Sequence, residues 1–340
     1  MQHPCKAARI GVVIVGIIVS LAGCGRKAPT DREVVVYCSV DQEVAEPILA
    51  AFEKQTGIRA AARFDTEASK TVGLVQKLRA EAKHPAADVF WSGEIFYTIQ
   101  LANEGLLAAY SSQITKDWPI QFRNSEGQWF GFALRGRVIC YHTGRVAKEE
   151  APKSLEDLLD SKWKGKIVMA RPSRGTTGGD VASWFVEYGT EKATEILKGL
   201  KVNEVRLVEG NSTAVRMVGT GQADICLTDT DDVYAGIRNG WPVAMEPLRR
   251  NNKGTLAIPN TAAKIKGGPN PATADRLMEF LLGGECERML LASDSHNWPV
   301  RATTGPEEQK FAISDPAAVD YATVAAALPT ALKTVEEVFD

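Results

Sequence analysis

The sequence predicts an α/β protein with two lobes. Its 340 residues are about twice the length of an ordinary domain. Short apolar strands alternate with amphipathic helices along most of the chain, which is the pattern of a largely parallel sheet. The first strand, Val34–Cys38, has no polar face, as expected when helices cover both sides of the sheet. A Gly-, Trp- and Phe-rich stretch at 127–132 separates two such series, one for each lobe.

The first lobe is predicted to begin with the strand Val34–Cys38. Val44, Ile48 and Phe52 then recur one helical turn apart, and Gly57 ends this helix. The later elements of this lobe are the strand Ile58–Phe64, a helix containing Val72, Val75 and Leu78, and the strand Asp88–Trp91.

In the second lobe the same alternation resumes after a strand at Arg137–Tyr141 that carries the chain across. We expect lobe 1 to contain 34–132 and about 250–290, and lobe 2 to contain 133–249 and about 291–340. The elements that follow are strands at Lys166–Ala170, Asp224–Thr228 and Thr255–Pro259, and helices at Gly178–Tyr188, Glu191–Leu200, Ser212–Gly219, Asp232–Asn239, Pro271–Leu282 and Ala317–Phe339.

The N-terminal segment 1–23 is predicted to be a lipoprotein signal peptide. Two basic residues precede the uncharged run 10–25, which is too short to span a membrane. Leu21-Ala22-Gly23-Cys24 resembles a bacterial lipobox, so we expect lipidation of Cys24, with residues 24–33 as a tether to the periplasmic face of a membrane. The alternative is an ordinary signal peptide with a chance cysteine.

The composition is that of a globular chain with a substantial core. Hydrophobic residues make up 44% of the chain and charged residues 24%. A formal net charge of -2 argues against a nucleic-acid-binding protein, which would carry a basic face. Composition therefore excludes disordered, collagen-like and polytopic membrane proteins as well as nucleic-acid binders.

Four cysteines remain after the signal peptide and the lipidated residue are set aside. No CxxC pair and no Cys/His pair at zinc spacing occurs, so a cysteine metal site is not expected. In an oxidising compartment the four thiols allow two bridges in three pairings, between which sequence cannot choose. Buried core thiols are the simpler interpretation. The four are Cys38, Cys140, Cys226 and Cys286.

Polar loops follow five of the predicted strands directly. Ligands of open α/β sheets bind in the crevice beyond the carboxyl ends of the strands, so we expect these loops to converge on one site. Ser, Thr and Asp at such positions are also ordinary helix caps, and Asn211 before the helix at 212–219 is interpreted as a cap only. The candidate ligand-binding residues are Ser39, Asp41, Thr66, Glu67, Ser92, Glu94, Arg174, Thr176, Thr177, Asp229, Asp231 and Asp232.

Catalytic motifs are missing from the sequence. HExxH, the P-loop, GxGxxG and GxSxG do not occur, and the three histidines after residue 24 are far apart. We therefore predict no catalytic residue and no catalytic cofactor. A periplasmic hydrolase that uses an acidic cleft remains the alternative from another functional class.

Several segments between Val34 and Pro299 resemble the periplasmic solute-binding proteins of ABC importers, most closely the ferric-ion-binding group. The resemblance implies a type II-like fold of two α/β lobes, joined by crossing strands, that close on a ligand and deliver it to a membrane permease. We expect the protein to act as a monomer. The segments are Val36–Ser39, Phe52–Ile58, Pro85–Trp91, Gly105–Leu107, Lys153–Leu158, Lys162–Lys166 and Gly210–Ser212.

The resemblance also implies a metal site, with substitutions. In ferric-binding members, a histidine after the first strand, a glutamate after the third strand and two adjacent tyrosines hold the metal. Here Asp41 stands for the histidine, and Asp231 and Asp232 stand for the tyrosines. The glutamate is either displaced to Glu94 or replaced by Ser92 and Gly93. Carboxylate oxygens suit hard cations, so Fe³⁺ or another hard metal cation is the leading transported ligand.

A small anion or zwitterion is the alternative ligand. Thr176–Gly179 opens a helix, where free backbone N–H groups and the helix dipole favour phosphate, phosphonate or carboxylate. Arg174 beside it would pair with such a group. A zwitterion with an amine would use the acidic loops as well.

Overall fold

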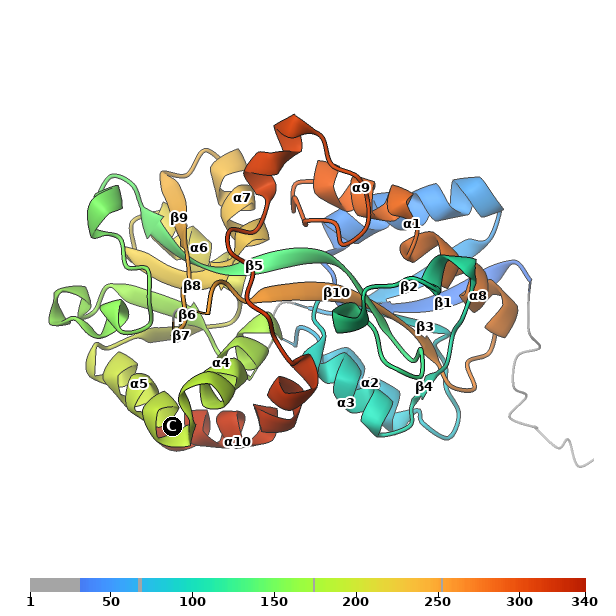
Figure 1. Ribbon diagram of the computed structural model, residues 1–340, viewed down its shortest axis with the longest axis horizontal. Helices are drawn as coiled ribbons and strands as arrows, with labels where there is room; N and C mark the ends of the chain where they lie inside the picture. Colours follow the sequence, from blue (N-terminus) through green and yellow to red (C-terminus); the bar gives the residue numbers. More distant parts are fainter. Residues whose placement is uncertain (1–30, 67–68, 174, 252) are drawn as a thin grey trace, which may run out of the picture.

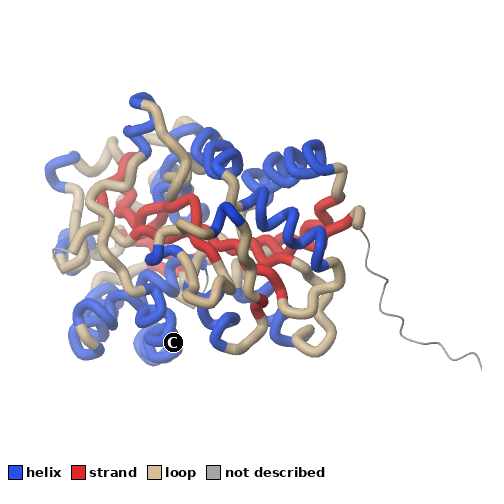
Figure 2. The backbone as a smooth tube through the Cα atoms, turned by 45° about the vertical axis from the view of Figure 1, so that its right-hand side comes forward, coloured by secondary structure: helices blue, strands red, loops and turns tan. Residues whose placement is uncertain are grey.

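The computed structural model describes residues 31–66, 69–173, 175–251 and 253–340. Its strands form one curled, ten-stranded sheet that runs through both lobes, with helices on both faces (Figures 1 and 2). The strand order is β2-β1-β3-β10-β5-β8-β6-β7, with β4 beside β10 and β9 beside β5. The predicted two-lobe α/β fold is confirmed. Cys24 and the signal segment lie outside the described residues.

In lobe 1, β1 lies parallel to both β2 and β3, and β10 runs antiparallel to β3, β4 and β5. Alternate residues of a strand point to opposite faces. Val34 and Val36 therefore pack with helices α1, α8 and α9, whereas Tyr37 packs with α2 and α3. The elements are β1 (Glu33–Cys38), α1 (Gln42–Thr56), β2 (Arg59–Phe64), α2 (Val72–Ala80), β3 (Val89–Ser92), α3 (Phe96–Asn103), β4 (Leu107–Ala108), β10 (Ala257–Ile265), α8 (Pro271–Leu281) and α9 (Gly284–Ala292).

In lobe 2, β6 lies parallel to β7 and β8, while β5 runs antiparallel to β8 and β9. Helices α6 and α7 cover one face, and α4 and α5 cover the other. The elements are β5 (Phe130–His142), β6 (Ile167–Ala170), α4 (Gly175–Tyr188), α5 (Thr190–Val202), β7 (Arg206–Val208), α6 (Asn211–Gly219), β8 (Ile225–Asp229), α7 (Thr230–Arg238), β9 (Val243–Pro247) and α10 (Tyr321–Phe339).

Strand β5 belongs to both lobes. Its first half, Phe130–Gly136, pairs with β10, and its second half, Arg137–His142, pairs with β8 and β9. The sequence predicted only Arg137–Tyr141 of this strand. All of its residues except His142 are buried, so the crossing strand runs through the core rather than over the surface.

The C-terminal helix α10 connects the lobes on a second side. It packs against α3 of lobe 1 and against α4 and α5 of lobe 2. The Tyr321 hydroxyl donates a hydrogen bond to the Ala257 carbonyl oxygen of β10, at 2.6 Å. The segment before α10 crosses over β5 and β10 in Figure 1, and its residues Asp315 and Ala317 bond to the backbone of Thr255.

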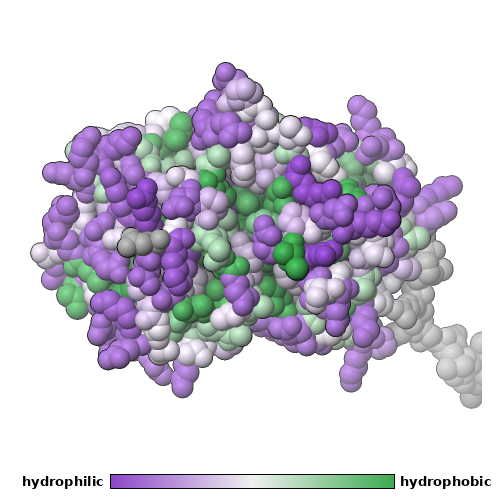
Figure 3. Space-filling view, in the orientation of Figure 1, coloured by the Kyte–Doolittle hydropathy of each residue, from purple (hydrophilic) through white to green (hydrophobic). Residues whose placement is uncertain are grey.

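Short 3₁₀ turns complete the fold. None of the helices in the described ranges is long and apolar enough to cross a membrane. The visible face is mainly hydrophilic, with small hydrophobic patches gathered near its middle (Figure 3). The 3₁₀ turns are Gln113–Thr115, Ile120–Phe122, Lys148–Glu150, Asp157–Leu159, Ser161–Trp163 and Pro306–Phe311.

Candidate functional site

A narrow polar cleft lies between the lobes, beyond the carboxyl ends of β1, β3, β6 and β8. The convergence of loops that the sequence predicts therefore occurs at this place. The cleft is lined by Ser39, Asp41, Lys70, Thr71, Gly93, Glu94, Arg135, Ala170, Gly175, Thr176, Thr177, Glu209, Gly210, Asn211, Asp229, Asp231 and Asp232.

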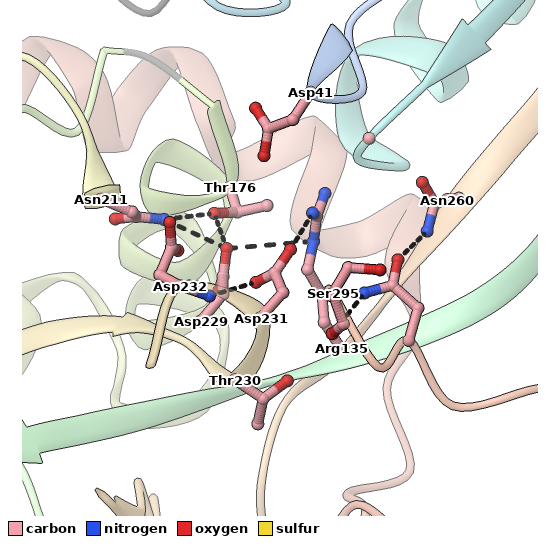
Figure 4. Close-up of polar contacts among 12 residues, drawn as sticks. Asp41, Arg135, Thr176, Asn211, Asp229, Thr230, Asp231, Asp232, Asn260 and Ser295 are labelled. Carbon is pink, nitrogen blue, oxygen red and sulfur yellow. Dashed lines mark hydrogen bonds and ion pairs between the residues drawn. The ribbon is translucent and has the colours of Figure 1, made fainter. Parts of the chain in front are cut away.

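Asp229, the last residue of β8, is fixed by partners from three other elements. Its carboxylate accepts hydrogen bonds from Arg137 Nη1 at 2.8 Å, Thr176 Oγ1 at 2.5 Å and Asn211 Nδ2 at 3.1 Å (Figure 4 shows the last two). Burial opposes ionisation of this carboxyl, but the positive charges of Arg137 and Arg135 outweigh it and lower the pKa of Asp229. Asp229 is therefore an ionised carboxylate whose oxygens are already engaged.

Arg137 continues this network into the protein interior. Its side chain is fully buried, and its Nε lies 3.1 Å from the Asp180 carboxylate. Asp180 is also buried and lies beside the buried Arg250, which pairs with Glu187 at 3.2 Å. An uncompensated charge is very costly inside a protein, and in this row each basic side chain lies beside an acidic one.

Asp231 and Asp232, in the first turn of α7, stand beside Asp229. Ligand oxygens of the three carboxylates lie within 4.8 Å of one another. Asp231 Oδ2 is 2.7 Å from Arg135 Nη1, and Asp232 Oδ2 accepts a hydrogen bond from Thr228 Oγ1 at 3.1 Å. Burial raises the pKa of Asp231, and burial together with the two neighbouring carboxylates raises the pKa of Asp232 well above its ordinary value.

Arg135 extends from β5 into the space between these acids and lobe 1. A Cβ atom on Gly93 would lie 2.8 Å from Arg135 Nη2, so glycine at this position makes room for the guanidinium group. Besides its pair with Asp231, Arg135 forms a second, longer ion pair, from its Nε to Asp229 Oδ2 at 3.9 Å. Arg135 therefore supplies the positive charge beside Asp231, while Arg137 supplies the one beside Asp229.

The lobe 1 wall of the cleft carries Asp41 and Glu94. Asp41 faces the acid cluster from the opposite side (Figure 4) and forms an ion pair with Lys70. Glu94 is buried and accepts hydrogen bonds from the backbone N–H groups of Phe96 at 2.7 Å and Tyr97 at 3.2 Å. Burial raises the pKa of Glu94 to about 7. Glu94 thus caps the start of α3 while one side of it borders the cleft.

The glycines at the start of α4 have a packing role. A Cβ atom on Gly179 would overlap the ring of Phe96 in α3, and one on Gly178 would overlap the Pro172 carbonyl oxygen. The threonine hydroxyls before them are engaged within the protein, because Thr176 donates to Asp229 and Thr177 donates to Asn211 Oδ1 at 3.1 Å.

The structure brings together most of the residues that the sequence predicted for the site. Thr66 and Ser92 do not line the cleft: Thr66 bonds to Ser69 in its own loop, and Ser92 lies behind Glu94, to which it donates at 3.2 Å. Glu67 and Arg174 lie outside the described residues. The predicted residues that line the cleft are Ser39, Asp41, Glu94, Thr176, Thr177, Asp229, Asp231 and Asp232.

Sequence reasoning missed charged and polar residues of the cleft that include Lys70, Arg135, Glu209 and Asn211. Arg135 and Arg137 in the apolar run 130–142 could have indicated the site, since a charged residue within a buried strand needs a carboxylate partner. Asn211 is not the helix cap predicted for it. Gly210 holds that position, and the Asn211 amide binds Thr176, Thr177 and Asp229 instead.

Comparisons with known proteins agree with the geometry. Residues 34–293 match the family described as bacterial extracellular solute-binding protein. Iron uptake protein A1 of Synechocystis is 28% identical over 309 residues, covering 86% of this chain and 84% of the relative. A putative 2-aminoethylphosphonate-binding periplasmic protein of Salmonella typhi is 25% identical over 77% of this chain and 75% of the relative.

Among solved structures, iron-bound HitA from Pseudomonas aeruginosa superposes with a TM-score of 0.82 at 26% identity. The superposition covers 91% of this chain and all of HitA. Family match and fold agree, and the resemblance inferred from the sequence is confirmed: the chain belongs to the bacterial extracellular solute-binding protein family.

Proposed function

We propose that this protein captures a hard metal cation, with ferric iron as the leading candidate, and delivers it to the permease of an ABC importer. Iron uptake protein A1 and iron-bound HitA, whose names refer to iron, support this ligand. The proposal includes export, lipidation at Cys24 and action as a monomer in the periplasm. It also assigns 34–132 with about 250–290 to lobe 1 and the remainder, 133–249 with about 291–340, to lobe 2.

The observation that carries the proposal is the charge of the cleft. Among the described residues that line it, six are acidic and only Lys70 and Arg135 are basic. Like carboxylates a few ångströms apart resist joint ionisation until a cation neutralises them. The acids are Asp41, Glu94, Glu209, Asp229, Asp231 and Asp232.

Within this set we assign the metal to Asp231 and Asp232, with Asp41 and Glu94 on the opposite wall. Asp229 serves a different purpose, because its oxygens already accept bonds from Arg137, Thr176 and Asn211. Binding through Asp231 requires that Arg135 leave its ion pair, so the metal replaces the guanidinium charge with its own.

A small anion or zwitterion such as a phosphonate remains the second candidate. Lys70 and Arg135 favour it, since both are cations that line the cleft. The aminoethylphosphonate relative supports the same alternative. In that case Arg135 would bind the ligand rather than compete with it.

The test compares two double variants that remove the same charge. Asp231→Asn with Asp232→Asn removes the proposed ligands, whereas Glu149→Gln with Glu150→Gln neutralises an exposed acid pair outside the cleft. Titration calorimetry with ferric citrate, calcium and aminoethylphosphonate measures each affinity, and thermal unfolding checks the fold. We expect the Asn variant to lose ferric binding by at least 100-fold while the Gln variant keeps it.

Ferric binding retained by the folded Asn variant would contradict the metal assignment. Phosphonate binding by the wild-type protein, kept or strengthened in the Asn variant, would favour the second candidate. Turnover is not expected, because the family is one of solute-binding transport proteins.

A further inference from the structure

Two of the four buried cysteines lie directly opposite each other on neighbouring strands. The antiparallel register of β5 and β8 pairs Cys140 with Cys226. Both are fully buried in the same hydrophobic cluster, under α6 and α7. The two side chains therefore lie side by side in that cluster, and both are free thiols in this structure.

This position suits a covalent bond. Directly opposed residues of an antiparallel pair point to the same face, with Cα atoms about 4.5–5.5 Å apart. That separation lies within the range of about 4.4–6.8 Å found for disulfides. By contrast, the register partners of Cys38 in lobe 1 are Phe64 and Trp91. Cys286 also lies in lobe 1, on helix α9, and so has no strand partner. Of the three pairings that the sequence leaves open, the fold favours the one that contains Cys140–Cys226.

We propose that Cys140 and Cys226 form a disulfide bond across β5 and β8 in the exported protein, and that the structure describes the reduced form of this pair. The oxidant is a disulfide-bonded thiol oxidase, and the reaction is thiol–disulfide exchange. One cysteine thiolate attacks the oxidase disulfide to give a mixed disulfide. The second cysteine thiolate then attacks the sulfur of the first cysteine, which forms the Cys140–Cys226 bond and releases the oxidase thiolate. Two electrons pass to the oxidase, which leaves as a dithiol carrying two protons.

The bond would fix the part of the sheet that carries the cleft. Arg137 and Asp229, whose ion pair anchors the site, lie three residues along each strand from the two cysteines and oppose each other in the same register. A shift of one residue would turn every side chain of a strand to the other face and separate this pair. The disulfide would also close a loop of 85 residues, 141–225, and so restrict the unfolded chain.

The experiment follows each cysteine separately. The purified chain is refolded in a mixture of reduced and oxidised glutathione, which makes the result independent of export and of the ligand. It is then alkylated in denaturant before and after reduction, and its peptides are mapped by mass spectrometry. We expect Cys38 and Cys286 to be alkylated at once, and Cys140 and Cys226 only after reduction, with a linked peptide that contains both.

The proposal is wrong if all four thiols are alkylated before reduction, or if the linked peptide joins any other pair. A second measurement uses thermal unfolding. Reductant should lower the melting temperature of the wild type and of Cys38→Ala with Cys286→Ala by several degrees. It should leave Cys140→Ala with Cys226→Ala unchanged, and an equal shift in this variant would contradict the pairing. Loss of metal binding with an intact linked peptide would count only against the proposed ligand.

Discussion

At the scale of single residues, Arg135 controls the charge of the cleft. It is buried, it pairs with Asp231 at 2.7 Å, and its longer contact reaches Asp229. Replacing it leaves a cluster of carboxylates without its counter-charge, and removing one partner of a buried pair costs about 3–5 kcal/mol. A cation bound between the same carboxylates would offset that loss.

We therefore predict opposite effects of Arg135→Gln on stability and on metal affinity. The ligand-free variant should unfold about 3 kcal/mol more easily than the wild type. Ferric citrate should bind about tenfold more tightly, because the competing guanidinium is gone, which corresponds to about 1.4 kcal/mol. Urea unfolding and calorimetry measure the two quantities. Weaker metal binding together with lost phosphonate binding would instead identify Arg135 as an anion ligand.

Glu94 gives the cleft a pH-dependent stability. Its pKa in the folded protein is about 7, above the ordinary value of 4.5, so the folded state holds this proton more tightly than the unfolded chain. Stability from this group is complete below pH 4.5 and is lost as the pH rises to about 7. A shift of this size corresponds to roughly 3 kcal/mol for a buried group.

Glu94→Gln should remove this dependence, since a glutamine oxygen can accept the same backbone hydrogen bonds without titrating. In the ligand-free protein, the stability of the variant relative to the wild type should rise by up to roughly 3 kcal/mol between pH 5 and pH 8. Denaturant unfolding at several pH values measures it. Parallel pH profiles for the two proteins would rule out a proton on Glu94.

Five of the six acids that line the cleft were predictable, because each stands at or just after the end of an apolar strand, where ligands of α/β sheets bind. Glu209, which follows β7, was not predicted. Which acid binds and which one supports the others was not predictable. That distinction depends on Arg135 and Arg137, which reach Asp231 and Asp229 from a strand more than 90 residues away in the sequence. No local pattern encodes such a pairing.

At the scale of elements, the close contact between α3 and α4 places the two walls of the cleft. Gly179 packs against the ring of Phe96 without room for a side chain. Adding a methyl group to a tightly packed contact costs about 1–3 kcal/mol through displaced backbone or side chains. The same change is harmless where the space is open.

We expect Gly179→Ala to destabilise the protein by about 2 kcal/mol and to weaken ligand binding, because α4 carries Thr176, a partner of Asp229. Gly284→Ala, in the first turn of α9, is the matched control, since its nearest neighbour is the flexible end of Arg288 at 3.4 Å. The control should be neutral or slightly stabilising. Equal melting temperatures of the two variants would show that α4 shifts to accommodate the added methyl group without loss of stability.

Periodicity predicted most helices and strands but missed α3, α9, β4, β7 and β9. Helix α3 has six buried residues among eight, so it lacks the polar face that marks a helix in sequence. Strands β7 and β9 are short and border the sheet, and their half-buried residues give no continuous apolar run. Half of β5 was also missed, because its glycines interrupt the strand pattern.

At the scale of the whole molecule, the lobes are joined by β5, by β10 and by the segment that leads to α10. Two-lobe proteins joined by a few strands close around a ligand by small backbone rotations at the crossing. Saturating ferric citrate should therefore reduce the radius of gyration measured by small-angle scattering, and Asp231→Asn with Asp232→Asn should abolish the change. Identical profiles with and without a ligand that calorimetry shows to bind would argue against hinge closure.

The crossing strand β10 also has a consequence for how the chain folds. β10 pairs with β3 and β5, yet it follows β3 in the sequence by more than 160 residues. Lobe 1 cannot complete its sheet until β10 has been synthesised, and long-range pairing of this kind slows folding. A chain released from the ribosome would thus stay unfolded longer than one with local pairings. For the exported protein proposed above, late completion of the sheet would give the export machinery time to act.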